Sequence, residues 1–170
     1  MILEPARLEF ARIQANELET FSGLICAVAQ ALEDRGQKLW DQEWLQPQAL
    51  LEKYGLESMH LARIDGEPVA AFVLLDTDPD FWPNVTVGES LFIHKLVVAR
   101  AWKGHNLSAR VLDFGVNQVL ERGKKFLRLD TDATRPALCD LYEKYGFTRV
   151  GRKQTQSFDY ALYELEVRQK

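Results

Sequence analysis

The stretch Leu91–Ser108, LFIHKLVVARAWKGHNLS, places the tightest constraint on how this chain can fold. Its first half is apolar and predicts a buried strand, and its second half is a small turn with basic and polar residues. A helix predicted over Leu107–Arg122 and a strand predicted over Phe126–Thr131 follow directly. A strand, a helix and a second strand in this order imply a parallel strand pair joined by a right-handed crossover.

The other elements predict antiparallel pairing around this parallel pair. Asp65-Gly66 lies between two apolar runs and is a hairpin signal, and Val69–Leu75 is nearly continuously apolar, which indicates a buried strand. We therefore expect an α+β fold with one mixed, mostly antiparallel sheet of about seven strands and about four helices.

The expected strands share short apolar or alternating patterns. They cover Arg7–Ile13, Ser58–Ile64, Glu67–Leu75, Gly88–Val98, Phe126–Thr131, Phe147–Arg152 and Phe158–Val167. The expected helices have apolar residues at three-and-four spacing. They run from an Asn16 cap to a point before Gly36, from Pro47 to Gly55, over Leu107–Arg122 and over Arg135–Tyr145, with Asp132 or Thr134 capping the last.

Length and charge narrow the class of protein. The 170 residues predict one domain over residues 1–170, and a net charge of −4 lacks the basic footprint of a nucleic-acid-binding protein. No run approaches the roughly 18 apolar residues of a membrane helix, and Glu4 and Pro5 stand where a signal peptide would be basic or apolar. We expect a cytoplasmic protein without nucleic-acid or membrane partners. Cys26 and Cys139 show no metal-ligand spacing, so no metal is expected.

The turn Lys103–Ser108 is a candidate anion site. A helix start offers unpaired N–H groups and the positive end of a dipole, and a turn of small residues lets an anion approach them. The three spaced glycines of a dinucleotide fingerprint and the ending of a phosphate-binding loop are both missing. The residues by themselves therefore indicate an anion without identifying it.

Two motifs of this chain resemble those of the GNAT superfamily of acetyl-CoA-dependent N-acetyltransferases. The family's acyl-CoA loop, Arg/Gln-x-x-Gly-x-Gly/Ala, follows a strand similar to Leu96-Val97-Val98 and corresponds to Lys103–Ser108. A second family signature, Asn-x-x-Leu-x-x-Leu/Phe-Tyr-Glu-Lys-x-Gly-Phe, is similar to Arg135–Phe147. The separation of the motifs and the order of elements also agree over nearly the whole chain.

The resemblance implies an acetyl-CoA site, and this chain departs from the family pattern within it. The implied cofactor-binding residues are Leu96, Val97, Val98, Lys103, Gly104, His105, Asn106, Leu107, Ser108, Arg135 and Tyr142. Lys103 replaces the usual Arg or Gln, Asn106 and Ser108 stand at the small positions, and Arg135 replaces Asn. Asparagine tolerates the left-handed backbone conformation better than most residues, so Asn106 is a plausible replacement for glycine.

The resemblance also implies the catalytic groups. A backbone N–H near Val97 and Val98 would stabilise the carbonyl oxygen, and Tyr142 matches the tyrosine that protonates the departing CoA sulfur. The alternative for Tyr142 is packing in the helix. His94 resembles a strand histidine of arylalkylamine acyltransferases that helps to deprotonate the amine, although it could instead be a satisfied strand residue.

Two further features leave alternatives open. Glu89 could replace His94 as the base in another strand register, and Trp40 and Trp44 form either a plug between helices or a wall of the substrate site. We expect acetyl transfer to a primary amine of a small molecule or an amino acid. A peptide N-acetyltransferase and a non-catalytic acyl-CoA-binding module are the alternatives, and pairing of the last strand would allow a homodimer.

Overall fold

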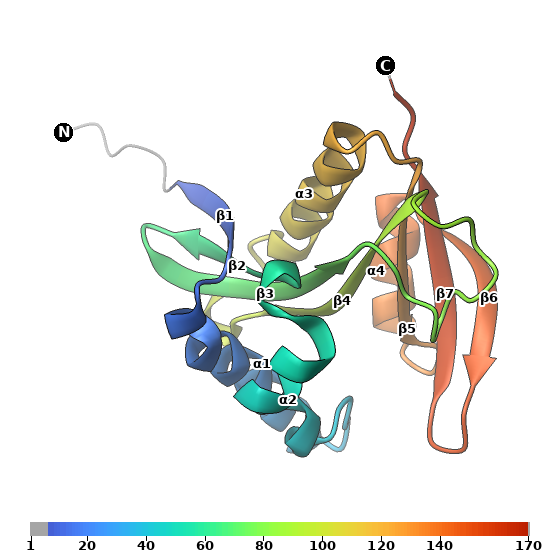
Figure 1. The fold of residues 1–170 in the computed structure, drawn as a ribbon. Coiled ribbons are helices and arrows are strands. Elements are labelled where there is room, and N and C mark those ends of the chain that lie inside the picture. Colours follow the sequence, from blue (N-terminus) through green and yellow to red (C-terminus); the bar gives the residue numbers. More distant parts are fainter. Residues whose placement is uncertain (1–6, 170) are drawn as a thin grey trace. The chain divides into compact units, whose positions relative to one another are not determined.

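A computed structural model describes residues 7–169 of the chain, and Figure 1 shows its ribbon. The segment with Glu4 and Pro5, on which the expectation about a signal peptide rests, lies outside the described residues. Within residues 7–169, no helix combines the length and the apolar character needed to cross a bilayer.

The strands follow the predicted α+β plan. Among residues 7–169, hydrogen bonds connect seven strands in the order β1-β2-β3-β4-β5-β7-β6, and β4 and β5 form the predicted parallel pair. The other recorded pairs, β1 with β2, β2 with β3, β5 with β7 and β6 with β7, are antiparallel. The bounds are β1 Leu8–Arg12, β2 Met59–Ile64, β3 Glu67–Leu75, β4 Ser90–Val98, β5 Phe126–Asp132, β6 Thr148–Gln154 and β7 Asp159–Glu166.

In the part of the chain that the structure describes, four α-helices accompany the sheet, as expected: α1 Leu18–Glu33, α2 Pro47–Tyr54, α3 Leu107–Glu121 and α4 Pro136–Tyr145. The described chain divides into two compact units, each built from two segments. The first contains the residues up to Val73 and Lys95–Val111, and the second contains Leu74–His94 and the residues from Leu112 onward. Strand β4 and helix α3 each pass from one unit into the other.

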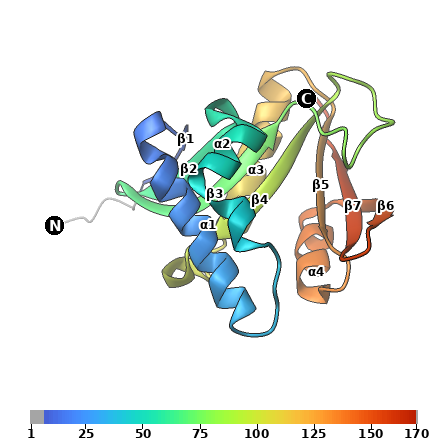
Figure 2. The same ribbon diagram turned by 60° about the horizontal axis from the view of Figure 1, so that its bottom comes forward.

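The first unit contains β1, β2, most of β3, α1 and α2. Figures 1 and 2 both show α1 and α2 side by side. Helix α1 buries Phe21 and Ile25. At the predicted hairpin turn between β2 and β3, Asp65 and Gly66 have φ values of 50° and 84°. Two consecutive positive φ values match the twist of a two-residue hairpin, which fixes the register of β2 against β3.

The start of α1 differs from the prediction. Asn16 lies inside a short 3₁₀ turn, Ala15–Glu17, and does not cap the helix. Instead, the Gln14 backbone N–H donates to Glu17 Oε2 at 2.7 Å, so the capping box lies two residues earlier. The sequence offers a polar residue at both places, and a 3₁₀ turn ahead of the helix shifts the cap.

The second unit contains the first half of β4 together with β5, β7, β6 and α4. Strand β7 pairs with β5 on one side and β6 on the other, so β6 is the edge strand at this end of the sheet and pairing of β7 with a second chain would first require β6 to move. Before α4, Arg135 occupies the cap position without a side-chain cap. Asp132 Oδ1 accepts from the backbone N–H and hydroxyl of Thr134, so both predicted caps stabilise the preceding turn instead.

Two glycines that lie within helices of the described chain, Gly23 and Gly115, provide a test of packing. A Cβ added at Gly115 in α3 would lie 3.0 Å from Ile93 Cδ1 and 3.1 Å from Leu127 Cδ2, whereas Gly23 in α1 has open space. We expect Gly115→Ala to lower the free energy of unfolding by about 1–2 kcal/mol, because overpacking outweighs the gain in helix propensity. Gly23→Ala, the matched control, should raise it by about 0.5–1 kcal/mol. Urea unfolding of both variants checks this, and equal stabilisation would contradict the packing.

Candidate active site

The turn after β4 belongs to the first unit and has the predicted strand, turn and helix order. A 3₁₀ turn, Arg100–Trp102, follows the strand, and α3 begins at Leu107. Between them, Gly104 and Asn106 have φ values of 82° and 58°. Asn106 therefore adopts the left-handed conformation that its position in the turn requires, as its residue type allowed.

The start of α3 offers an anion a set of N–H groups. The first helical hydrogen bond runs from the Arg110 N–H to the Asn106 carbonyl at 3.3 Å, so the N–H groups before Arg110 precede the helical ladder. Lys103, His105 and Asn106 have exposed side chains, whereas Leu107 is buried and anchors the turn. A preformed turn, a helix N-terminus and an adjacent lysine together fit a phosphate anion.

The end of β4 contains a backbone irregularity that the sequence did not reveal. Lys95 has a φ of 54° in the middle of the strand, which interrupts the regular extended geometry before Leu96, Val97 and Val98. Val97 is buried, and Leu96 and Val98 are half-buried. The Lys95 Nζ lies 4.4 Å from the centre of the Trp40 ring. Such a cation–π contact fixes the predicted tryptophan loop to β4.

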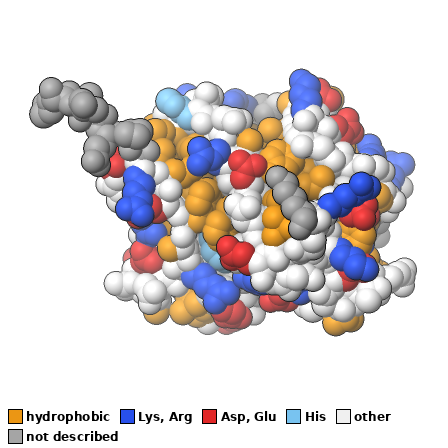
Figure 3. Space-filling model, turned by 90° about the horizontal axis from the view of Figure 1, so that it is seen from above, with side chains coloured by type: hydrophobic (Ala, Val, Ile, Leu, Met, Phe, Trp, Pro, Cys, Tyr) orange, Lys and Arg blue, Asp and Glu red, His pale blue; other side chains and the backbone are white. Residues whose placement is uncertain are grey.

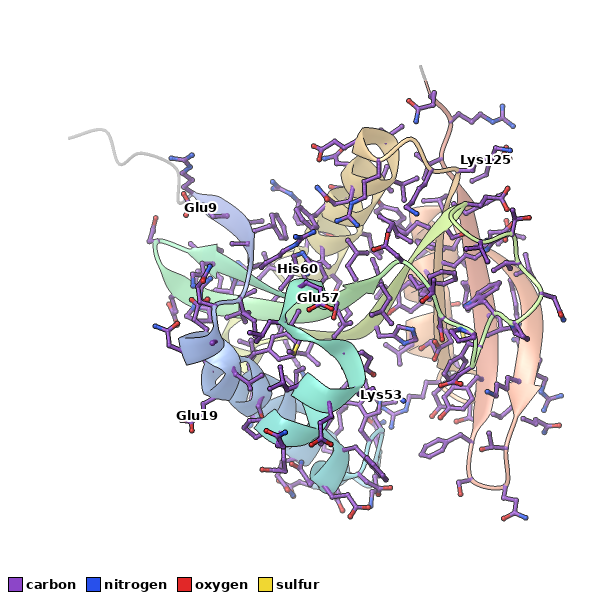
Figure 4. The ribbon with its side chains drawn as sticks, viewed as in Figure 1. Glu9, Glu19, Lys53, Glu57, His60 and Lys125 are labelled. Atoms are coloured by element: carbon purple, nitrogen blue, oxygen red, sulfur yellow. The ribbon has the colours of Figure 1, made fainter. Side chains whose placement is uncertain are left out.

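The other histidines and Trp44 differ in how far they are buried and in what they contact. Trp44 is 62% exposed, which rules out a buried plug at that position. His60, labelled in Figure 4, is buried on β2, where its Nδ1 lies 2.9 Å from the Ser58 carbonyl and its ring stacks on Phe72. His105 lies in the exposed turn, 5.3 Å from the Trp102 ring centre. His94 is thus the histidine that the structure places beside a buried carboxylate, Asp78, and a largely buried one, Asp130.

His94 lies between two aspartates of the second unit. Its Nε2 is 2.8 Å from Asp78 Oδ2, and its Nδ1 is 3.4 Å from Asp130 Oδ1. The side chains of His94, Asp78 and Asp130 are 13%, 7% and 12% exposed. Asp130 comes from the predicted strand β5, whereas sequence reasoning missed Asp78. The signal was the acidic run Asp76-Thr77-Asp78-Pro79-Asp80 directly after a buried strand.

Aromatic contacts hold this loop in place. Phe81 contacts His94 with ring centres 5.9 Å apart and Tyr160 with ring centres 5.0 Å apart. The Trp82 N–H of the backbone donates to the Asp78 carbonyl at 2.8 Å, and the buried Trp82 ring packs against Phe92. The loop that carries Asp78 is therefore anchored beside β4.

Asp78, His94 and Asp130 have side chains of the types that bind metal ions, and their possible ligand atoms lie within 4.8 Å of one another. Their arrangement is less suited to a cation. Asp78 faces one ring nitrogen of His94 and Asp130 faces the other, so an ion on either nitrogen would leave one carboxylate on the opposite side of the ring. Carboxylates at both ends of an imidazole suit hydrogen bonding and proton exchange.

Tyr142 lies on α4 in the second unit and is buried. Its ring packs against Phe147 and Tyr163, with centres 5.9 and 6.0 Å apart. Burial raises the pKa of Tyr142 well above its ordinary value, and the neighbouring Asp130 and Cys139 raise it further. The phenol therefore keeps its proton at neutral pH and can donate it, although the same packing also suits a core residue.

Other predicted residues have structural partners. The Tyr145 hydroxyl donates to Asp113 Oδ1 at 2.7 Å, and Arg135 Nε lies 3.2 Å from Asp132 Oδ2. Glu89, the alternative base, directly precedes β4, and its Oε1 lies 3.8 Å from Lys125 Nζ. Basic groups at this end of the unit are also paired with acids: Arg122 and Lys124 with Asp76, and Arg128 with Glu164.

Comparison with known proteins identifies the family. Residues 25–147 match the Acetyltransferase (GNAT) family. The uncharacterized N-acetyltransferase YesJ of Bacillus subtilis (strain 168) is 30% identical over 159 residues, which cover 89% of this chain and 86% of the relative.

Solved structures share the fold. A GNAT-family acetyltransferase from Listeria monocytogenes 4b F2365 has a TM-score of 0.77 at 21% identity, with 94% of each chain covered. The Salmonella typhimurium protein yncA, solved with its cofactor acetyl-CoA, has a TM-score of 0.68 at 12% identity, with 96% of this chain and 95% of that chain covered. From the family match and the Bacillus relative, this chain belongs to the GNAT family of acetyl-CoA-dependent acetyltransferases.

Proposed function

We propose that this chain transfers the acetyl group of acetyl-CoA to a primary amine of a small molecule. The observation that carries the proposal is a candidate proton acceptor that adjoins Asp130 and a buried candidate proton donor whose pKa the charge of Asp130 helps to raise, both in one unit. His94 Nδ1 lies 3.4 Å from Asp130 Oδ1, and the same aspartate contributes to the raised pKa of Tyr142. Acetyl transfer to an ammonium needs such a pair, because one proton must leave the amine and another must reach the departing thiolate.

The turn Lys103–Ser108 would bind the pyrophosphate of the cofactor. The N–H groups of residues 104–108 and the Lys103 ammonium supply donors and positive charge. Arg135 is a weaker candidate, since Asp132 already holds its guanidinium. The backbone of Leu96–Val98 would align the pantetheine arm, and an N–H of Val97 or Val98 would donate to the carbonyl oxygen that gains negative charge.

The chain's own groups would then move two protons. Bound acetyl-CoA supplies a thioester that the amine can attack directly. His94 accepts a proton from the substrate ammonium, which exposes the nitrogen lone pair. The Tyr142 hydroxyl gives its proton to the CoA sulfur as the C–S bond breaks. The nitrogen loses its second proton to solvent as the amide forms, and the phenolate regains one proton from solvent, so these two transfers cancel. His94 releases the substrate's proton to solvent, so charge balances over the cycle.

The structure favours catalysis over a non-catalytic acyl-CoA-binding module. Asn106 was the departure that most weakened the resemblance, and it adopts the left-handed backbone expected of glycine. A buried tyrosine together with a histidine between two largely buried aspartates supports catalysis, because binding of the cofactor alone does not require this combination. Peptide N-termini remain the alternative acceptors, and a peptide panel separates them from small amines.

A CoA-release screen over small amines, amino acids and peptide N-termini tests the proposal, with Tyr142→Phe as the variant. We expect small amines to release CoA. Tyr142→Phe should lower kcat by about 100-fold with less than about a threefold change in the KM for acetyl-CoA, because a proton donor acts in the transition state. The tyrosine's role would be wrong if kcat were unchanged, and the proposed function would be wrong if only peptides, or no amine, reacted.

The raised pKa of Tyr142 also predicts alkaline instability. Because the folded-state pKa lies above the unfolded value near 10, the tyrosine contributes stability below pH 10 that is lost as pH rises toward the folded value. Between pH 10 and 11, the parent should lose roughly 1 kcal/mol more than Tyr142→Phe. Urea unfolding at several pH values gives the slope of the free energy of unfolding against pH for the parent and for Tyr142→Phe. The difference between these slopes does not depend on whether the substitution also changes stability at pH 8. Parallel slopes would contradict the burial of the phenol.

The conformation of Asn106 predicts how the cofactor site tolerates substitution. Asn106→Gly should keep the Kd for acetyl-CoA within about twofold, since both residues accept a positive φ. Asn106→Val should raise the Kd about tenfold, because a β-branched residue is strained there. Asn84→Val, at an exposed loop position without a positive φ, is the matched control. Calorimetric titration with acetyl-CoA checks the series, and unchanged binding by Asn106→Val would refute this role of the turn.

A further inference from the structure

The two aspartates beside His94 differ in their distance from its ring. Nε2 and Asp78 Oδ2 are 2.8 Å apart, which is the separation of a charge-assisted N–H···O⁻ hydrogen bond. Nδ1 and Asp130 Oδ1 are 3.4 Å apart, which is longer than an ordinary N–H···O hydrogen bond. A neutral imidazole has one N–H, and these heavy-atom distances assign it to Nε2. In this tautomer, Nδ1 has the lone pair on the Asp130 side of the ring.

The position of Asp78 is well defined. Its side chain is 7% exposed, its carbonyl accepts the Trp82 N–H at 2.8 Å, and Trp82 is itself buried. The Arg128 guanidinium lies 5.3 Å from the Trp82 ring centre and pairs with Glu164 at 2.6 Å. Because this chain of contacts fixes the loop to β5 and β7, Asp78 can hold the imidazole in one orientation.

The separation of His94 Nδ1 and Asp130 Oδ1 allows one ammonium group to donate hydrogen bonds to both atoms. A nitrogen can lie about 2.9 Å from each of two acceptors that are 3.4 Å apart, so one ammonium can donate to both. The two aspartates carry two negative charges, and two cations of this region contact other groups: Lys153 Nζ lies 4.6 Å from the Phe81 ring centre and donates to the Asp80 carbonyl, and Arg135 pairs with Asp132. A carboxylate attached next to the amine would approach these aspartates and be repelled.

We propose that Asp78 is a positioning residue that keeps His94 protonated at Nε2, and that Asp130 and His94 Nδ1 receive the ammonium of an acceptor without a neighbouring carboxylate. This inference rests on the proposed function and narrows its substrate class to primary amines that have no carboxylate next to the ammonium, which excludes amino acids. The ring of Phe81, which adjoins His94, provides apolar surface for the carbon skeleton. Amino acids are accordingly poor acceptors.

Kinetics with matched substrate pairs tests the substrate class. Phenethylamine with phenylalanine and butylamine with norvaline differ within each pair by one carboxylate next to the single amine. The parent should favour the amine of each pair by about 100-fold in kcat/KM. Asp130→Asn should raise the KM for the amine at least tenfold, leave the KM for acetyl-CoA unchanged and reduce the preference to below about tenfold. Asp80→Asn, in the same loop but exposed, should behave as the parent does.

Ring-nitrogen NMR of histidine-labelled protein at pH 8 tests the position of the proton without requiring turnover. The parent should show His94 protonated at Nε2, and Asp78→Asn should lose this preference and lower kcat, with Asp78→Glu restoring part of both. A parent His94 protonated at Nδ1, or preferred acetylation of the amino acids, would overturn the inference. If acetyl-CoA binds and no amine reacts, both the proposed function and the ammonium site are wrong. The NMR result would still decide whether Asp78 positions the proton of His94.

Discussion

The parallel pairing of β4 with β5 is the constraint on which the candidate chemistry depends. The register runs from Ser90 opposite Phe126 to Ile93 opposite Leu129, and it ends there. The next residues along the two strands are His94 and Asp130, whose side chains lie 3.4 Å apart. The residue after His94 has a positive φ, so the ladder stops at the point where the reactive groups begin. A shift of one residue in this register would send the histidine to the other face of the strand and separate it from Asp130.

The start of the same pair is secured by charge. Arg128 lies on β5 with 6% exposure, and its guanidinium donates to the Ser90 hydroxyl on β4 and to Glu164 on β7. The Phe126 ring and the Trp82 ring cover the guanidinium at 4.4 and 5.3 Å from their centres. A buried arginine that lost its carboxylate partner would be strongly unfavourable, so these contacts penalise other arrangements of the three strands and the loop.

Much of this architecture could be predicted from the sequence because its signals are local. The Asp65-Gly66 turn and the glycines after helices fixed the hairpin and the helix ends, and hydrophobic periodicity located the strands. Two motifs at a suitable separation indicated the family. His94 and Tyr142 emerged by resemblance, and their catalytic roles stay predictions.

Asp78 was missed, because it lies in a loop whose path depends on the packing of Trp82 against Phe92 and on the hydrogen bond from the Trp82 backbone N–H to the Asp78 carbonyl. Local patterns also could not predict two other features. The cap of α1 depends on a 3₁₀ turn that shifts it by two residues, and the edge position of β6 depends on pairing between strands.

The backbone of Asn106 has a consequence for how motifs of this kind are recognised. What the turn requires at that position is a dihedral angle, and a glycine is one of several residues that can provide it. A pattern written in residue letters records the commonest solution and rejects chains that reach the same geometry with asparagine. A pattern that allowed every residue tolerant of a left-handed backbone, and then demanded a helix start and a basic neighbour, would retain them. The information in the loop is thus partly conformational, and sequence signatures of phosphate-binding turns are better defined by the angles they permit than by glycine alone.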